Sequence, residues 1–471
     1  MPDSVMIHDL RPYPRYRDSG APWLGRVPEH WKIARMKTAV LQINEQTAKK
    51  QPNDVYVALE NVESWTGQVR LLDSTVSFDS QVKKFRRDDV LFGKLRPYLA
   101  KVARLSVDGV CVGEFFVLRP RSSDVLPRFL EIMLRSNTIV DVISSSTFGA
   151  KMPRADWDFV GSLLVSFPPP PEQAAIVRFL DHADRRIRSY IRAKQTLIEL
   201  LKEQKQTIIH HAVTRGLDSN VKLKSSGLDW LGQIPEHWTI NRNGRLFAQR
   251  NQTGFAELPI LEVSLRTGVR VRNFDSSDRK QVMSDLSKYK RAVRCDIAYN
   301  MMRMWQGAVG VVPVDGLVSP AYIVARPLDG TDPRYFSNLF RTAAYMREVD
   351  AYSRGIVKDR NRLYWEDFKQ MPSPCPPPNE QARIANALEQ MTRSLDEAVT
   401  HEMNGIEFLR EYRTRLVADV ATGKLDVREI GATFFDETGQ VEALEETDTV
   451  NEGDEASVDS DVETMPEESE A

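Results

Sequence analysis

Two stretches rich in basic residues are the strongest candidates for chemistry in this sequence. Residues 83–104 contain eight Lys or Arg against two acidic residues, with aromatic residues between them, and residues 266–303 are similarly basic. Arginine can donate two hydrogen bonds to a guanine edge, whereas lysine mostly contacts phosphate, so such stretches favour nucleic-acid binding. The candidate contacts are Lys83, Lys84, Arg86, Arg87, Lys94 and Arg96 in the first stretch, and Arg270, Arg272, Arg279, Lys280, Arg291 and Arg303 in the second.

Motifs for catalysis or metal binding do not stand out. The sequence has no GxxxxGK[ST] phosphate loop, no GxGxxG after a strand and no HExxH pair. His30 and His237 each lie in a Pro-Glu-His-Trp sequence, and because no matched Ser, Cys or Asp partners accompany them, we favour a structural role. Asp88-Asp89 is more typical of a turn than of a metal site. We therefore predict a chain that is not an enzyme and that holds no metal or cofactor.

The net charge of −2 hides two regions of opposite sign. From residue 431 to 471 the chain has 15 Asp or Glu and no Lys or Arg, so residues 1–430 carry a formal charge of +13. A basic body with an acidic end is typical of a polyanion binder with a disordered tail, although evenly scattered surface charges are an alternative. No secretory signal or membrane span is visible, and the three cysteines lack disulfide or zinc spacing. We expect a cytoplasmic protein that does not enter a membrane.

An internal repeat organises the chain. The segment 19–31, which contains Trp-Leu-Gly-x-Val-Pro-Glu-His-Trp, recurs at 226–238 with an offset of 207, and six of the eight tryptophans pair between the copies. Arg96 and Arg303 occupy equivalent positions, which makes them the first candidates for DNA contact, although a structural salt bridge is an equal alternative. The run 83–87 has no charge-for-charge partner in the second copy. We predict two folded units, related by a pseudo-twofold, that read different targets on one architecture.

Each copy combines a mixed α+β part with a long helix. Strands at 110–118 and 308–314 and a helix at 126–135 indicate the α+β parts, which span about 32–167 and 239–375. Long helices are predicted at 172–214 and 380–422.

The apolar residues of the two long helices recur in steps of three and four, which is a heptad seam. Tyr190 and Leu197 are expected within the seam, and Lys194 and Glu402, which lie near the helix centres, are expected to pair and fix the register. Two separate helices, each lying on its own domain, are the alternative. The predicted seam consists of Ile176, Leu180, Ile187, Lys194, Leu201 and Ile208 in the first helix and Ile384, Leu388, Leu395, Glu402, Leu409 and Leu416 in the second.

These motifs together resemble the DNA specificity subunit of type I restriction-modification systems. The likeness rests on the two Trp-Leu-Gly boxes, the Glu-Gln pairs at 172–173 and 380–381, the long helices and the Gly-Leu-Asp or Gly-Lys-Leu-Asp endings. It implies two tandem α/β target recognition domains separated by two long helices that form an antiparallel coiled coil. The segments would be an arm (1–18), domain 1 (19–168), helix 1 (169–218), domain 2 (219–375), helix 2 (376–426) and an acidic, disordered tail (427–471).

The resemblance also implies partners and chemistry located outside this chain. Its target would be double-stranded DNA, with each domain reading half of a bipartite sequence and the helices setting the spacing. Its partners would be methyltransferase subunits, two in number, and restriction or translocase subunits. S-adenosylmethionine, ATP and Mg²⁺ would bind to those partners. A standalone DNA-binding adaptor outside restriction-modification is the alternative.

Overall fold

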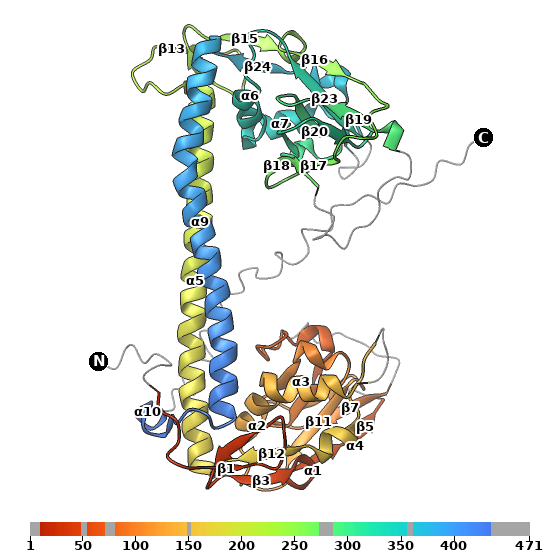
Figure 1. Cartoon of the computed structure of the whole chain (residues 1–471), viewed down its shortest axis with the longest axis vertical. Coiled ribbons are helices and arrows are strands. Elements are labelled where there is room, and N and C mark those ends of the chain that lie inside the picture. The colour runs from red at the N-terminus through yellow and green to blue at the C-terminus, as the bar shows by residue number, and fades with distance from the viewer. Residues whose placement is uncertain are drawn as a thin grey trace, which may run out of the picture. The chain divides into compact units, whose positions relative to one another are not determined.

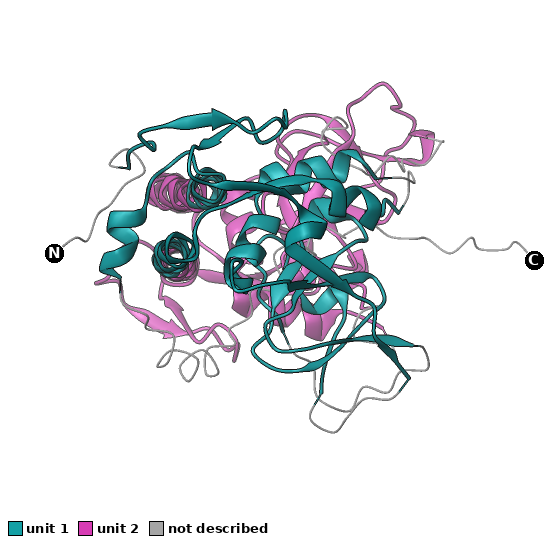
Figure 2. Cartoon of the chain, turned by 90° about the horizontal axis from the view of Figure 1, so that it is seen from below, with its two compact units in different colours: residues 1–191, 407–471 teal, residues 192–406 magenta. Residues whose placement is uncertain are grey.

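The computed structural model describes residues 10–48, 54–70, 81–147, 152–272, 286–355 and 361–434. The chain divides into two compact units, residues 1–191 with 407–471 (unit 1) and residues 192–406 (unit 2), coloured teal and magenta in Figure 2. Both units mix helices with short strands, so the predicted α+β class is confirmed. Because both divisions fall inside long helices, each of these helices contributes to both units. The six segments drawn from the sequence stay predictions.

Two helices, α5 (Pro170–Arg215) and α9 (Pro378–Ala421), are far longer than the other described helices (Figure 1). Proline opens each helix, where its missing N–H removes no helical hydrogen bond. Gly216 (φ +81) and Gly423 (φ +77) follow the helix ends, and a left-handed glycine is a common helix stop. The two predicted long helices are confirmed, each beginning two residues earlier than expected. In the described ranges no helix is long and apolar enough to cross a membrane.

The inward face of α5 differs from the predicted seam in its middle. All twelve predicted seam residues are buried or half-buried. Tyr190 and Leu197, however, are 52% and 42% exposed, so the expectation that they lie in the seam is wrong. Ile191 and Ile198 take the inward positions instead. The inward face therefore runs through Ile191 and Ile198, each one residue later than predicted, and its residues still follow one another in steps of three and four.

Two ion pairs join α5 to α9 within unit 2. Lys194 Nζ lies 2.7 Å from Glu402 Oε2, and Lys205 Nζ lies 2.6 Å from Asp396 Oδ1. The residue numbers rise along α5 as they fall along α9, so the two helices are antiparallel here. Gly405 leaves space for the lysine, because a Cβ at this position would lie 3.1 Å from Lys194 Nζ.

Unit 1 is built on a four-stranded antiparallel sheet. A second four-stranded sheet is made of short strands. The predicted strand 110–118 is divided between the two sheets, because the chain turns at 112–114. The first sheet has the order β4 (Val40–Ile43), β11 (Phe115–Pro120), β8 (Val90–Gly93), β9 (Val102–Arg104). The second has the order β5 (Gln46–Thr47), β7 (Val82–Phe85), β10 (Gly109–Cys111), β6 (Val55–Val57). The helices are α1 (Met36–Ala39), α2 (Pro127–Leu134), α3 (Asn137–Ser145) and α4 (Trp157–Ser162).

Unit 2 repeats this central sheet with the same strand order. Its sheet runs β16 (Phe247–Arg250), β23 (Tyr322–Pro327), β20 (Ile297–Asn300), β21 (Val309–Val311). Two-stranded pairs follow, β17 (Leu261–Ser264) with β18 (Gly268–Val271) and β19 (Lys290–Ala292) with β22 (Gly316–Val318). The helices are α6 (Pro333–Phe340), α7 (Ala343–Tyr352) and α8 (Trp365–Phe368). Two smaller strand pairs also recur. The pair β1 (Tyr16–Asp18) and β2 (Arg26–Pro28) of unit 1 matches β13 (Leu223–Ser225) and β14 (Gln233–Pro235) of unit 2. The pair β3 (Lys32–Arg35) and β12 (Leu164–Phe167) matches β15 (Thr239–Arg242) and β24 (Pro372–Cys375).

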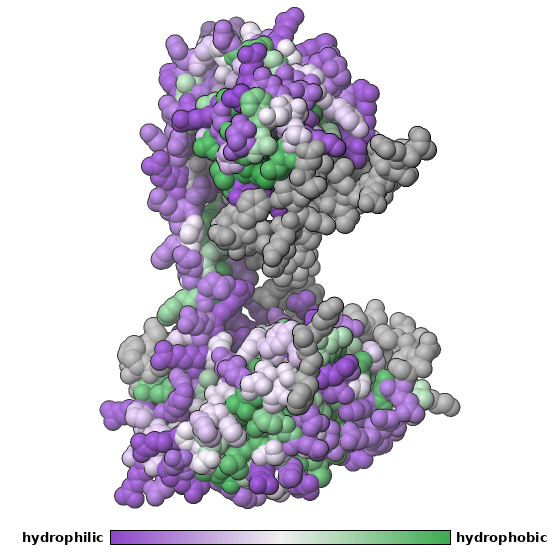
Figure 3. Space-filling view, turned by 45° about the vertical axis from the view of Figure 1, so that its right-hand side comes forward, coloured by the Kyte–Doolittle hydropathy of each residue, from purple (hydrophilic) through white to green (hydrophobic). Residues whose placement is uncertain are grey.

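Each unit packs its own stretch of both long helices into its core. Trp31 is fully buried in a unit 1 cluster that includes Ile176 of α5 and Leu416 of α9. Trp238 is fully buried in the matching unit 2 cluster with Ile384 of α9. Figure 3 shows hydrophilic side chains interspersed with apolar areas over the drawn face of both units. The helices are therefore structural parts of both units.

The acidic tail begins later than predicted. Residues 427–434, which the sequence assigned to a disordered tail, include the helix α10 (Arg428–Thr433), and Val427 is fully buried. Gly431 lies against α5 so closely that a Cβ would come within 2.3 Å of Ala175 O. The prediction of disorder is wrong for these eight residues, and the rest of the predicted tail lies outside the described residues.

The Lys194–Glu402 pair allows a test of helix register. We expect Lys194→Leu to destabilise the chain by about 1–2 kcal/mol, because Glu402 loses its partner in a partly buried site. Carbodiimide should join Lys205 to Asp396 in the native register, and the variant should lose part of this cross-link. The charge swap Lys194→Glu with Glu402→Lys should restore both properties. The same swap at the exposed pair Lys202–Glu199 is the control, and an unchanged cross-link and unfolding midpoint in Lys194→Leu would contradict the register role.

Candidate nucleic-acid interface

A buried carboxylate at the start of α5 explains why the Pro-Glu-His-Trp box is present. Glu172 is 7% exposed, and its Oε1 accepts hydrogen bonds from Trp31 Nε1 (2.8 Å) and Tyr13 OH (2.7 Å). Its Oε2 lies 2.7 Å from His30 Nε2. Burial and the Glu172 carboxylate raise the pKa of Tyr13. The box is therefore fixed to the first turn of the long helix.

Unit 2 contains the same contact in a simpler form. His237 Nε2 lies 2.7 Å from Glu380 Oε2 at the start of α9. No tyrosine corresponds to Tyr13, and Trp238 Nε1 has no hydrogen-bond partner among the described residues. Both box histidines thus hold a helix in place, which agrees with the structural role expected for them.

The glutamine after each of these glutamates holds the loop that leads into α2 in unit 1 and into α6 in unit 2. Gln173 Oε1 accepts from Leu126 N (2.8 Å), and its Nε2 donates to Pro168 O (2.8 Å). In unit 2, Gln381 Oε1 accepts from Asp332 N (2.8 Å), with a matching bond from its Nε2 to Pro376 O. Both glutamines are fully buried. Each Glu-Gln pair therefore couples a long helix to the box and to the start of α2 or α6.

Residues 86–89 of the first basic stretch form the turn between β7 and β8, and the second copy repeats that turn between β19 and β20. Asp88 (φ +68) and Cys295 (φ +72) hold the same left-handed conformation at equivalent positions. Matched aspartates accept backbone N–H groups in both turns: Asp89 from Arg86 (2.8 Å), Asp296 from Val293 (2.8 Å), Asp108 from Arg87 (2.7 Å) and Asp315 from Arg294 (2.9 Å). At the offset of 207, Lys84 corresponds to Arg291 and Arg87 to Arg294, so the expectation that this run has no charge-for-charge partner is wrong in part.

Lys83 and Lys290 correspond in position and in contact, and both face inward. Lys83 Nζ donates to Phe115 O (2.9 Å), and Lys290 Nζ donates to Tyr322 O (2.8 Å). Burial lowers the pKa of both lysines. Lys83 is 8% exposed, so we leave it out of the proposed DNA contacts.

The other candidates in unit 1 lie nearer to solvent. Arg86, Arg87 and Arg96 are exposed, and Lys84 and Lys94 are half-buried. Lys84 Nζ lies 3.3 Å from Glu45, whereas Arg86, Lys94 and Arg96 have no ion pair with another described residue. Apart from Lys84 on β7, the cations of unit 1 therefore lie on the turns at the two ends of the buried strand β8.

The unit 2 candidates are more strongly engaged with their neighbours. Arg291 pairs with Asp315 at 3.1 Å and lies over the Phe255 ring. Arg270 pairs with Glu262, and Arg272 and Arg303 are half-buried. Each of the four described candidates of unit 2 is therefore ion-paired or half-buried. Arg279 and Lys280 lie outside the described residues.

The loop after β8 and the loop after β20 share a 3-10 turn but differ at the arginine before it. Arg96 has φ +50, its N–H donates to Pro153 O (2.8 Å), and the nearby Tyr98 side chain is 47% exposed. Arg303 has φ −130 at the equivalent position. A left-handed non-glycine residue is strained and persists only where its surroundings hold it, as they do at binding sites. The structure thus presents Arg96 and Tyr98 together on a constrained loop.

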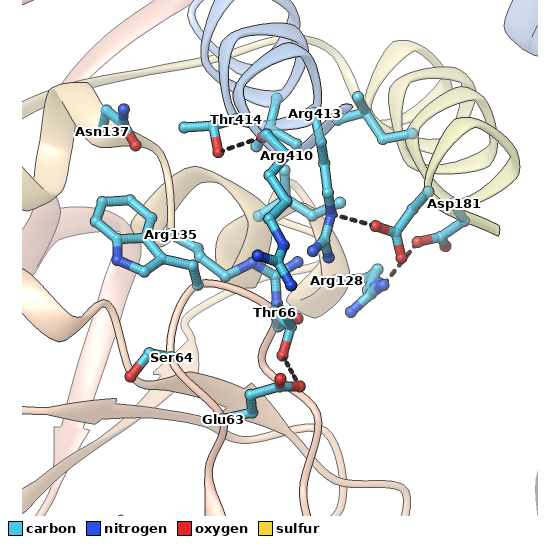
Figure 4. Close-up of a pocket in the computed structure, with 15 residues that line it drawn as sticks. Glu63, Ser64, Thr66, Arg128, Arg135, Asn137, Asp181, Arg410, Arg413 and Thr414 are labelled. Carbon is cyan, nitrogen blue, oxygen red and sulfur yellow. Dashed lines mark hydrogen bonds and ion pairs between the residues drawn. The ribbon is translucent and has the colours of Figure 1, made fainter. Parts of the chain in front are cut away.

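An arginine network that sequence reasoning missed joins α2 to the long helices within unit 1 (Figure 4). Arg128 lies 2.6 Å from both the buried Glu131 and Asp181 of α5. Arg413 of α9 pairs with Asp184 of α5 at 2.5 Å. Four of these residues, Arg128, Asp181, Asp184 and Arg413, border a pocket of about 380 Å³. Because the charges are paired across three helices, the network positions the α+β part on its helices.

A matched arginine after α2 and α6 was also missed. Arg135 donates to Thr66 O, and Arg341 donates to Leu265 O (2.6 Å). Glycines at left-handed positions leave room for both guanidinium groups, since a Cβ at Gly67 would clash with Arg135 and one at Gly268 would lie 3.3 Å from Arg341 Nη1. Extending the repeat comparison to these arginines, at an offset of 206, would have revealed the match. Among the described residues no group of three or more His, Cys, Asp or Glu could hold a metal ion.

Comparison with known proteins supports the fold and the sequence resemblance. No protein-family model matches the chain. The type I restriction enzyme EcoDI specificity subunit of Escherichia coli is 28% identical over 160 residues, which cover 33% of this chain and 35% of that protein. A chain from a solved type I restriction-modification system has TM-score 0.65 at 17% identity, covering 85% of this chain and 99% of that chain. The HsdS subunit from Thermoanaerobacter tengcongensis has TM-score 0.48 at 20% identity, covering 85% and 98%.

The predicted resemblance to type I specificity subunits is confirmed. The sequence match spans about a third of the length of the E. coli specificity subunit, and the structural match extends the shared fold over 85% of this chain.

The two glutamates provide a test of the helix–box contact. We expect Glu172→Ala to lower the free energy of unfolding by about 1–3 kcal/mol, because buried donors of Trp31 and Tyr13 lose their acceptor. Glu380→Ala should cost less, since Trp238 makes no such bond. Chemical denaturation with hydrogen exchange at residues 13–31 and 230–238 measures both effects. Glu29→Ala, at an exposed position of the same box, is the control, and equal effects of all three variants would contradict this assignment.

Proposed function

We propose that this chain is the specificity subunit of a type I restriction-modification complex. In this role it binds double-stranded DNA without catalysing a reaction, and each unit reads one half of a bipartite target. Methyltransferase subunits, two in number, and restriction or translocase subunits bind to it. S-adenosylmethionine, ATP and Mg²⁺ bind to those partners.

The observation that carries this proposal is a repeated frame with different loops. Both units have the same central strand order and the same contact between the box histidine and the glutamate in the first turn of a long helix. On the exposed loop after the strand, however, Arg96 differs in backbone conformation from Arg303 at the equivalent position. A constant frame with variable loops suits a protein that must present two different reading surfaces in the same way.

The accessible cations of unit 1 suit both parts of DNA recognition. Arg86 and Arg87 lie on a turn whose backbone is fixed by aspartates, so their side chains can contact phosphates and set the position on DNA. Arg96 lies on the loop that differs between units, which favours base reading. Tyr98 adds an exposed aromatic ring beside it.

The helix pair suits a spacer and a docking surface. Both helices contribute residues to both units, so their length links the two recognition parts. On α5, the side chains of Leu197 and Leu200 are 42% and 57% exposed, one helical turn apart, and on α9 Met391 and Met403 are 47% and 50% exposed. Exposed apolar side chains on a helix pair are suited to an apolar face of a partner. We propose that the methyltransferase subunits dock here.

Arg96→Ala tests the reading loop. We expect a loss of about 10- to 100-fold in affinity for the preferred DNA, with relaxed preference at one or two base pairs, because a bidentate base contact is removed. Fluorescence anisotropy with target and mismatched duplexes at several salt concentrations measures this. Lys202→Ala, which removes an exposed helix cation, is the control. Unchanged affinity, salt dependence and preference in Arg96→Ala would exclude this residue.

Methylation mapping tests the whole proposal. Cells that express this chain with its cognate methyltransferase should carry methylated sites with two defined half-sequences and a fixed spacer. Removing one heptad at facing positions of α5 and α9 shortens each by about 10 Å, so the spacer should shrink by about three base pairs. A variant with seven facing residues replaced but none removed is the control. An unchanged spacer would contradict the spacer role, and no methylation in the presence of the methyltransferase would favour a standalone adaptor.

A further inference from the structure

The C-terminal end of the chain carries a strong charge that the proposed function does not use. Residues 436–470 contain 15 Asp or Glu, and residues 435–471 contain no Lys or Arg. The rest of the chain carries a net positive charge. A segment of this charge has the chemistry of a polyanion, as DNA does.

The structure fixes where this segment leaves the folded part. Arg178 Nε of α5 donates to Gly431 O (3.0 Å). The Phe434 ring stacks on His182, with ring centroids 4.0 Å apart, and also contacts Phe179. Residues 427–434 therefore tie the start of the acidic segment to α5 inside unit 1.

Unit 1 has exposed cations that another anion could bind. Arg86 and Arg96 are exposed, Lys94 is half-buried, and none of the three forms an ion pair with another described residue. The 37 residues from 435 to 471 span up to about 120 Å at ~3.3 Å per residue, which exceeds the roughly 40 Å width of a domain of this size. Attachment to the same unit keeps the local concentration of carboxylates high.

We propose that the acidic segment 435–471 binds the cations Arg86, Lys94 and Arg96 of unit 1 and competes with DNA for them. The docking itself follows from charge and attachment, and the competition rests on the proposed function. DNA that binds unit 1 then has to displace the tail carboxylates from these cations. Salt ions take up the freed carboxylates, so fewer ions are released in total when DNA binds. The segment therefore lowers DNA affinity most at low salt and also makes the salt dependence of binding shallower.

Zero-length cross-linking tests the docking without DNA. In the full chain, Arg86→Lys and Arg96→Lys keep the charge and add reactive amines. Carbodiimide at low salt should link carboxylates of 436–470 to residues 86, 94 and 96, and these links should disappear at about 1 M salt, where charges are screened beyond ~3 Å. Links to lysines of the long helices alone, or no links to unit 1, would overturn the proposal.

A full-length variant with all 15 tail carboxylates replaced by Asn or Gln tests the competition. We expect it to bind nonspecific duplex DNA about tenfold more tightly than the native chain at low salt, with a steeper salt dependence, and to match it at high salt. A chain with the tail order scrambled but the charge retained is the control and should behave like the native one. Equal affinity and slope in native and neutral chains would overturn the competition. If neither chain binds DNA, the proposed function fails, and the cross-links alone decide the docking.

Discussion

The glutamate in the first turn of each long helix, which is buried in unit 1 and half-buried in unit 2, makes the contact on which each unit depends. A carboxylate removed from water needs donors, and Trp31, His30 and Tyr13 supply them to Glu172. The adjacent Gln173 forms hydrogen bonds with the backbone of Leu126, just before α2, and of Pro168, just before α5. One dipeptide therefore fixes the box, the helix and the entry to α2 with respect to each other. The repeated motifs of the sequence are the parts that make this contact.

A frame fixed in this way leaves the exposed loops open to change. In both units the turn before β8 or β20 keeps its aspartates and its left-handed residue, and the strand before the turn keeps its inward-facing lysine. The loop after that strand keeps a short 3-10 turn in both units (Pro97–Leu99 and Met304–Gln306), but the residue before the turn differs in backbone conformation, with Arg96 left-handed (φ +50) and Arg303 at φ −130. The turn that both units share and the arginine that differs between them thus lie at opposite ends of one strand. Under the proposed function, this arrangement would let one architecture present two different surfaces to two half-sites.

The sequence predicted the features that depend on local periodicity and repetition. The two long helices, the repeat and the structural role of the box follow from spacing alone. The inward face of α5 did not, because Leu197 and Ile198 are both apolar and only packing decides which one turns inward. Lys83 was counted as a DNA contact because composition does not show that its ammonium reaches a buried carbonyl. The network around Arg128 joins helices distant in sequence, and no local pattern marks it.

The central claim is that each α+β part reads its own half-site on a shared frame. Replacing residues 19–168 with residues 226–375 would give a chain with two copies of the unit 2 reader. Selection of bound duplexes from a random DNA library, with this chain and the native chain in complex with the methyltransferase, measures what each one reads. The native chain should select two different half-sequences, and the exchanged chain should select the unit 2 half-sequence twice in inverted orientation. An unchanged target for the exchanged chain would contradict the account.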